Sequence, residues 1–136
     1  MLQANHFHRY APTKIDYAIN RYKTETKRLY QVLNDRLALQ DSNGWIVGGR
    51  FSIADLSCFS WVNWAEWAGV ETQPFPALQA WLEKIQQREA VKKGLDVPEK
   101  FEMKEKMKSQ EGAEEYAKYH SQWVMQGMES DQQKHQ

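Results

Sequence analysis

The sequence predicts an all-α fold on three observations. Residues 13–39 contain neither Gly nor Pro, and their apolar side chains recur at steps of three and four. Two further stretches, 52–68 and 76–94, begin and end at residues typical of helix boundaries. No stretch of useful length alternates apolar and polar residues as a half-buried strand does. We therefore expect a helical bundle of about five helices.

The first long helix is expected over residues 13–39. Steps of four and three place one apolar stripe along it, which is the pattern of a helix packed on a core. The members of this stripe are Ile15, Ile19, Tyr22, Thr26, Leu29, Leu33 and Leu37. The sequence "DSNG" at 41–44 has turn chemistry and ends the helix. The following "WIVGG", 45–49, is too short to be more than an extended linker.

The second helix, over residues 52–68, opens with a capping signal. Ser52 and Asp55 stand three apart, which is the spacing of a capping box with Asp in place of the commoner Glu. Each side chain is expected to accept a hydrogen bond from an otherwise unpaired amide at the helix start. Most of the helix circumference is apolar, and Asn63, Glu66 and Asp55 fill only a narrow arc. We therefore expect this helix to be central in the bundle and buried by its neighbours.

The remaining chain predicts two more helices. One starts at Pro76, which suits a first helical position, and stops at Gly94. Its apolar face consists of Leu78, Trp81, Leu82 and Ile85. A charged segment from Leu95 onward is expected to be irregular or partly helical. The last helix is expected over about 111–127, and residues 129–136 read as a flexible tail.

The composition excludes several classes of protein. A chain of 136 residues predicts one domain, and equal counts of basic and acidic residues, 18 each, predict neither nucleic acid nor an anionic membrane surface as a partner. A single cysteine allows no internal disulfide and no cysteine-rich zinc cluster. The apolar runs are too short for a membrane span, and the N-terminus lacks the apolar core of a signal peptide. We expect an intracellular globular chain without a metal site.

The motifs together resemble one known family. The Ser-Ile-Ala-Asp box that follows "WIVG" and a long helix, with "FPALQAWLEKIQQREAVKKGL" downstream, strongly resembles the C-terminal all-α domain of cytosolic glutathione S-transferases. The first 33 residues and the tail from "VPEKFEMKEK" are similar to the Nu-type and fungal prion-regulator-like branch. The resemblance covers residues 1–128, which we take as one domain whose first helix is apparently truncated at Met1.

The resemblance implies a division of labour in an intact homologue. An N-terminal thioredoxin-like domain activates the thiol of glutathione, and the helical domain forms the pocket for the hydrophobic substrate. The implied reactions are conjugation of glutathione to electrophiles, as in detoxification, and glutathione-dependent disulfide reduction. This sequence contains none of the thiol-activating features, so it implies no catalytic residue, weak or absent glutathione binding by this chain alone, and no activity alone.

The resemblance also implies which residues face the ligand. Arg21 matches an arginine that Nu-type enzymes aim at glutathione carboxylates, a role that suits its planar bidentate fork. Asn5 is implied as a second glutathione contact. Phe7, Tyr10 and Trp64 are implied as the wall of the substrate pocket.

Simpler interpretations of the same residues stay open. Arg21 can instead pair with Glu25, one helical turn further on. His6 and His8 lack a third ligand nearby in the sequence, so solvated histidines are expected rather than zinc ligands. Cys58 lies mid-helix without an activating neighbour and is expected to be inert packing. Three tryptophans at a spacing of three are expected mainly in the core: Trp61, Trp64 and Trp67.

A second class of function stays open as well. The same fold serves as a non-catalytic protein-interaction or scaffold module, and the sequence does not decide between the two. The resemblance that begins mid-helix leads us to expect an exposed docking surface near residues 1–10 and the first half of the long helix. Such a surface predicts a partner protein or a homo-oligomer. In either class the expected compartment is the cytoplasm.

Overall fold

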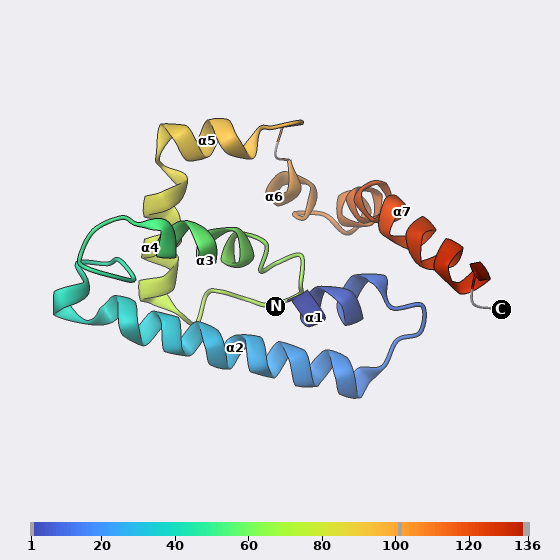
Figure 1. Cartoon of the computed structure of the whole chain (residues 1–136), viewed down its shortest axis with the longest axis horizontal. Helices are drawn as coiled ribbons and strands as arrows, with labels where there is room; N and C mark the ends of the chain where they lie inside the picture. Colours follow the sequence, from blue (N-terminus) through green and yellow to red (C-terminus); the bar gives the residue numbers. More distant parts are fainter. Residues whose placement is uncertain (1, 101, 135–136) are drawn as a thin grey trace.

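The structure, a computed structural model, describes residues 2–100 and 102–134. Within these ranges it is all-α, as predicted, and contains no strand (Figure 1). The elements in chain order are α1 (Leu2–Asn5), the π-helix η1 (His6–Tyr10), α2 (Asp16–Ala38), the 3₁₀ helix η2 (Gln40–Ser42), α3 (Ile53–Asn63), α4 (Pro76–Gln86), α5 (Glu89–Leu95), α6 (Met103–Lys106) and α7 (Gln110–Lys134). No helix in the described part of the chain is long and apolar enough to cross a membrane.

The long helix α2 packs against α1, η1 and α4 (Figure 1). It begins at Asp16 rather than at Thr13, and the predicted turn after it is formed by η2, with Asn43 and Gly44 at positive φ. α2 also organises the start of α4, because Asn34 Oδ1 accepts hydrogen bonds from the amides of Ala77 (2.9 Å) and Leu78 (3.2 Å). A side chain of one helix therefore satisfies amides that the first turn of another leaves unpaired.

The hydrophobic core lies between α2, α3 and α4. All three helices contribute side chains that are almost completely buried, which is where most of the stabilising apolar burial occurs. These side chains are Tyr30, Leu37, Phe59, Val62, Leu78, Trp81, Leu82 and Ile85. The predicted apolar face of α4 is therefore confirmed.

The prediction that the second helix is buried all round was wrong. α3 starts after Ser52 as expected but ends at Asn63, not at residue 68. Ile53 is 81% exposed, whereas Asp55, which we had placed on the polar arc, is completely buried. The reason is that Asp55 accepts a hydrogen bond from Trp81 of α4, which turns the carboxylate side of α3 toward the core and the opposite side outward.

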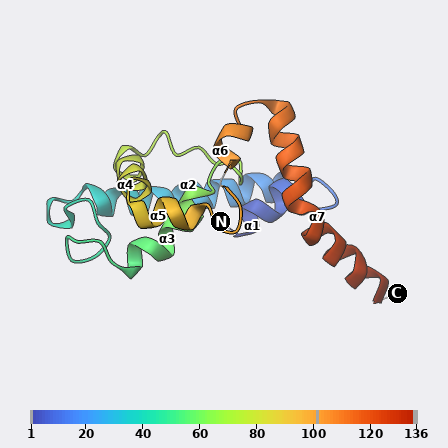
Figure 2. The same cartoon turned by 90° about the horizontal axis from the view of Figure 1, so that it is seen from above.

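The predicted helix over residues 76–94 is in fact two helices. α4 ends at Gln86 and α5 starts at Glu89 in a different direction (Figure 1), because Arg88 between them has extended backbone torsions. The Arg88 guanidinium lies 3.9 Å from the centre of the Phe51 ring, a tertiary contact that no local sequence signal announces. The last helix is longer than predicted, since α7 continues to Lys134 and projects away from the rest of the molecule (Figure 2).

Candidate functional site

The start of α3 is organised by the buried carboxylate of Asp55. Its Oδ2 accepts a hydrogen bond from the Ser52 amide (2.8 Å), while Ser52 Oγ accepts one from the Ala54 amide (3.3 Å), so the capping box is present. Its Oδ1 accepts from Trp81 Nε1 (2.9 Å) and from the Ile46 amide (3.1 Å). The carboxylate therefore joins the linker before α3, α3 itself and α4 at one point.

These hydrogen bonds keep Asp55 ionised. Burial by itself raises the pKa of the carboxyl, but the hydrogen bonds from Trp81, Ile46 and Ser52 outweigh burial and lower the pKa below its ordinary value. A charge with so many donors is stable inside the protein and has no free lone pair aimed at solvent. The role of this site is to hold the fold.

A second polar cluster lies where η1 meets the turn after α3. Trp67 Nε1 donates to Tyr10 Oη (3.0 Å), and Arg9 Nε donates to the Trp67 carbonyl (3.0 Å). The Arg9 guanidinium also lies 4.7 Å from the centre of the Trp67 ring, and Tyr116 of α7 meets that ring edge-on at 5.6 Å. The cluster ties η1, the turn after α3 and α7 together.

The three residues expected to form the wall of the substrate pocket lie in two separate groups. Tyr10 and Trp64 both contact Trp67, Tyr10 through its hydroxyl and Trp64 edge-on with ring centres 6.1 Å apart. Phe7 stacks instead on Tyr22 of α2, with ring centres 5.3 Å apart and an interplanar angle of 8°. All three residues therefore lie on or beside η1, but in two aromatic groups rather than one.

The two residues expected to contact glutathione differ in their surroundings. Arg21 is exposed on α2 and lines a shallow hollow there. In the structure the direct partner of Glu25 is Arg28, through Nη2 (2.7 Å) and Nε (2.8 Å). The hydrogen bond from Arg28 lowers the pKa of Glu25, and the charge of Arg21 adds to this without a described hydrogen bond or ion pair. Asn5 is half-buried, and its side-chain Oδ1 is buried without a hydrogen-bond partner.

The tryptophans at a spacing of three do not form one stripe, because α3 ends before two of them. Trp67 is buried, Trp64 is half-buried, and Trp61 is 47% exposed. As for the histidines, the described residues contain no group of three His, Cys, Asp or Glu side chains arranged to hold a metal ion.

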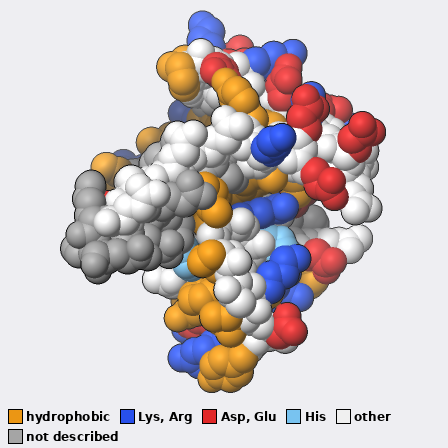
Figure 3. Space-filling view, turned by 90° about the vertical axis from the view of Figure 1, so that its right-hand side faces the viewer, with side chains coloured by type: hydrophobic (Ala, Val, Ile, Leu, Met, Phe, Trp, Pro, Cys, Tyr) orange, Lys and Arg blue, Asp and Glu red, His pale blue; other side chains and the backbone are white. Residues whose placement is uncertain are grey.

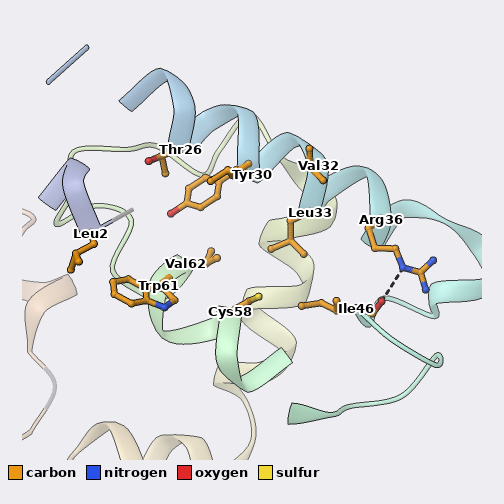
Figure 4. Close-up of a pocket in the computed structure, with 11 residues that line it drawn as sticks. Leu2, Thr26, Tyr30, Val32, Leu33, Arg36, Ile46, Cys58, Trp61 and Val62 are labelled. Carbon is orange, nitrogen blue, oxygen red and sulfur yellow. Dashed lines mark hydrogen bonds between the residues drawn. The ribbon is translucent and has the colours of Figure 1, made fainter. Parts of the chain in front are cut away.

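An apolar groove between α2 and α3 was not predicted. It has a volume of about 620 Å³, and Figure 4 shows the residues around it. Its lining residues are Leu2, Thr26, Leu29, Tyr30, Val32, Leu33, Arg36, Ile46, Cys58, Trp61 and Val62. Arg36 points away from it, since its Nε donates to the Ile46 carbonyl (2.9 Å). The groove thus follows the second half of α2, while the expected region near residues 1–10 and the first half of α2 also exposes apolar side chains, with Leu2 65% and Tyr17 76% exposed.

Cys58 lies in this groove and is half-buried rather than buried. Burial, and then the nearby Asp55 carboxylate, raise the pKa of its thiol. A thiol with a raised pKa is protonated at neutral pH and is a poor nucleophile. That Cys58 is an inert packing residue stays a prediction, and the structure differs from it in leaving the side chain only half-buried.

Comparison with known proteins defines the class. Residues 10–89 match the family described as "Glutathione S-transferase, C-terminal domain". The match covers more than half of the chain, and the chain belongs to this family.

Particular relatives sharpen the comparison. The Disulfide-bond oxidoreductase YfcG of Escherichia coli is 42% identical over 93 residues, which cover 68% of this chain and 42% of the relative. The Disulfide-bond oxidoreductase YghU of the same organism is 35% identical over 96 residues, which cover 65% of this chain and 32% of the relative. This chain therefore spans less than half the length of the curated relatives it matches.

Two solved structures share the fold. A glutathione transferase homolog from Lodderomyces elongisporus, with two GSH per subunit, has a TM-score of 0.66 and 37% identity, covering 71% of this chain and 45% of the other. Ure2p in complex with glutathione has a TM-score of 0.62 and 33% identity, covering 68% of this chain and 43% of the other. Proteins similar to this chain thus bind glutathione.

Proposed function

We propose that this chain is the helical part of a glutathione-dependent enzyme that conjugates glutathione to electrophiles or reduces disulfides with it. The observation that carries the proposal is the Lodderomyces elongisporus structure, which is similar over 71% of this chain and contains two GSH per subunit. The Escherichia coli relatives named as disulfide-bond oxidoreductases support the second reaction. A glutathione-dependent role places the chain in the reducing cytoplasm.

The domain boundary belongs to the same proposal. Residues 1–128 form the glutathione S-transferase C-terminal domain, and residues 129–136 form a tail. The described part of that tail, residues 129–134, continues α7. The last two residues lie outside the described part of the chain.

The geometry supports distinct roles for five residues. Arg21 binds a glutathione carboxylate, since its fork is exposed and is not engaged by Glu25. The unpartnered Oδ1 of Asn5 accepts a hydrogen bond from an N–H of the tripeptide. The aromatic groups around η1, with Phe7 in one and Tyr10 and Trp64 in the other, form the wall for an apolar electrophile.

The chemical step needs a group that stabilises the thiolate of glutathione. The thiol of glutathione has a pKa near ~8.5, like other free thiols, so a neighbouring donor must stabilise the thiolate before it attacks carbon or a disulfide sulfur. The raised pKa of the Cys58 thiol makes it a poor substitute nucleophile. We infer that a thioredoxin-like half supplies that donor and that this chain alone binds glutathione only weakly.

Complementation tests the proposal. The purified chain is mixed with a separately expressed thioredoxin-like half of YfcG, and both electrophile conjugation and disulfide reduction are measured. We expect no rate above the uncatalysed one for this chain alone, a rate with both halves, and a several-fold loss with Arg21→Ala. Lys27→Ala, on the same helix, is the matched control. If this chain alone turned over the substrate, and a substitution of one of its own residues abolished that rate, the proposal that it needs a second half would be wrong.

A non-catalytic interaction module is the second candidate, and the apolar groove favours it. Leu2, Val32 and Trp61 line this groove and are 65%, 56% and 47% exposed. Exposed apolar surface of this kind commonly marks a contact with another protein, here a second copy of the chain. Sedimentation should then show a dimer that Val32→Glu dissociates, with Val47→Glu outside the groove as control. A strict monomer at high concentration that binds no apolar dye removes this candidate.

A further inference from the structure

The turn after α3 brings together two nitrogen atoms from distant parts of the chain. Gly69 in this turn has a φ of +66°, which favours glycine. A Cβ on Gly69 would lie 2.6 Å from His8 Nε2 and 2.8 Å from Lys23 Nζ, both inside contact distance. The imidazole of η1 and the ammonium of α2 therefore lie against the same stretch of backbone, and a side chain at position 69 would have to displace both.

The positive charge here has no acidic partner among the described residues. Lys23 is half-buried, yet it forms no hydrogen bond or ion pair with any other residue in the described ranges. Arg9 is nearby, and its described contacts are the Trp67 carbonyl and ring and the Met107 sulfur, none of which carries negative charge. A partly buried charge is normally paired, because removing it from water is costly.

The low pKa of His8 is consistent with the same excess of positive charge. Burial, then Lys23 of α2, Arg9 of its own helix and Lys14 of the connecting loop lower the pKa of His8 to about 4. His8 is therefore neutral at neutral pH and can donate one N–H. On the face shown in Figure 3, Lys and Arg side chains and a histidine lie near the centre of the view, with Asp and Glu side chains beside them.

We propose that Lys23 and His8 against Gly69, with Arg9 and Lys14 beside them, form a binding site for an oxyanion. Lys23 supplies the ion pair and His8 a hydrogen bond, and the two remaining cations add long-range attraction. The shared chemistry of the ligand is a phosphate or a carboxylate group, either as a free ion or as part of a larger ligand. The proposal does not depend on the proposed enzymatic function, because Arg21 is not one of its groups.

Titration of the full chain with inorganic phosphate tests the site. At pH 7 and constant ionic strength, the NMR signal of the His8 ring, assigned with His8→Gln, should shift saturably. Phosphate should also raise the pKa of His8. Lys23→Gln should weaken binding at least fivefold, whereas Lys23→Arg should retain it. Lys27→Gln, an exposed lysine one turn further along α2, should bind phosphate as the parent does.

A second titration with glutathione distinguishes the two sources of the anion. Saturation by phosphate, with or without competition by glutathione, supports a site for a free oxyanion. A Lys23-dependent shift with glutathione alone supports the same site for a carboxylate. If neither ligand moves the His8 signal beyond matched chloride, or if Lys27→Gln weakens binding as much as Lys23→Gln, the proposal is wrong.

Discussion

The charged groups near the two ends of α3 differ in whether they have hydrogen-bond partners. At its start, the buried Asp55 carboxylate accepts hydrogen bonds from Ser52, Ile46 and Trp81. Beyond its end, the half-buried Lys23 ammonium and the neutral His8 ring lie against the backbone of the turn, with no carboxylate among their described partners. A satisfied buried charge stabilises a fold, whereas an unsatisfied one is available to a ligand.

The largest expected effect is at the satisfied end. Asp55→Ala leaves the amides of Ser52 and Ile46 and the Trp81 indole without their acceptor, so the free energy of unfolding should fall by about 3–4 kcal/mol. Chemical denaturation measures this fall. Asp35→Asn, which changes an exposed carboxylate whose described hydrogen bond is from Gln31, is the control and should change stability by less than about 0.5 kcal/mol. Equal effects of the two changes would contradict the assignment.

The next effect is a pH dependence at the other end. The pKa of His8 is about 4 in the folded chain and about 6.5 when unfolded, so between these values only the unfolded state binds the proton. The contribution of neutral His8 to the free energy of unfolding should therefore be fully present above about pH 6.5. The free energy of unfolding should fall by about 2–3 kcal/mol as the pH drops to 4.

His8→Gln should remove this contribution, and His6→Gln should retain it. Lys23→Gln should reduce it, because Lys23 is the strongest of the charges that lower the pKa of His8. The measurement is the unfolding midpoint at several pH values. An identical slope in His8→Gln and the parent would show that His8 is not the group responsible.

A smaller effect is expected at the helix cap. Ser52→Ala removes the acceptor for the Ala54 amide but leaves the Asp55 carboxylate in place, so we expect a loss of about 1 kcal/mol. Ser60→Ala, an exposed serine on the same helix, is the matched control. A loss as large as that of Asp55→Ala would mean that the hydroxyl, and not the carboxylate, organises the start of α3.

The smallest effect on stability is expected at Lys23. Lys23→Gln removes a charge that repels its neighbours, so the free energy of unfolding should stay within about 0.5 kcal/mol of the parent or rise slightly. Denaturation in phosphate-free buffer measures this. A loss of more than about 1 kcal/mol would indicate that Lys23 holds the fold through a carboxylate, which contradicts the contrast between the two ends.

The difference between the two ends of α3 also explains which features the sequence could predict and which it could not. Ser52 and Asp55 are three residues apart, so a local motif predicts the cap and the start of α3. The cluster around Gly69 combines residues more than 40 positions apart, and no local pattern joins them. The same limit applies to the buried side of α3, since it depends on Trp81 of another helix.

The candidate site also has features that the sequence pointed to and features that it missed. Resemblance to a family pointed to Arg21, Asn5, Phe7, Tyr10 and Trp64, and the structure shows where each lies without testing its role. The end of α3 at Asn63 and the break at Arg88 have no Gly or Pro to announce them. The apolar groove was missed because periodicity shows that a face is apolar but not whether a neighbour covers it.

The most direct test of the contrast measures how much phosphate stabilises three chains. A ligand that binds only the folded state raises the free energy of unfolding by RT ln(1 + [L]/Kd). We expect Ser52→Ala to be less stable than the parent yet to show the same increment in phosphate. We expect Lys23→Gln to be as stable as the parent yet to show little or no increment. An equal increment in Lys23→Gln and the parent, at matched ionic strength, would contradict the account.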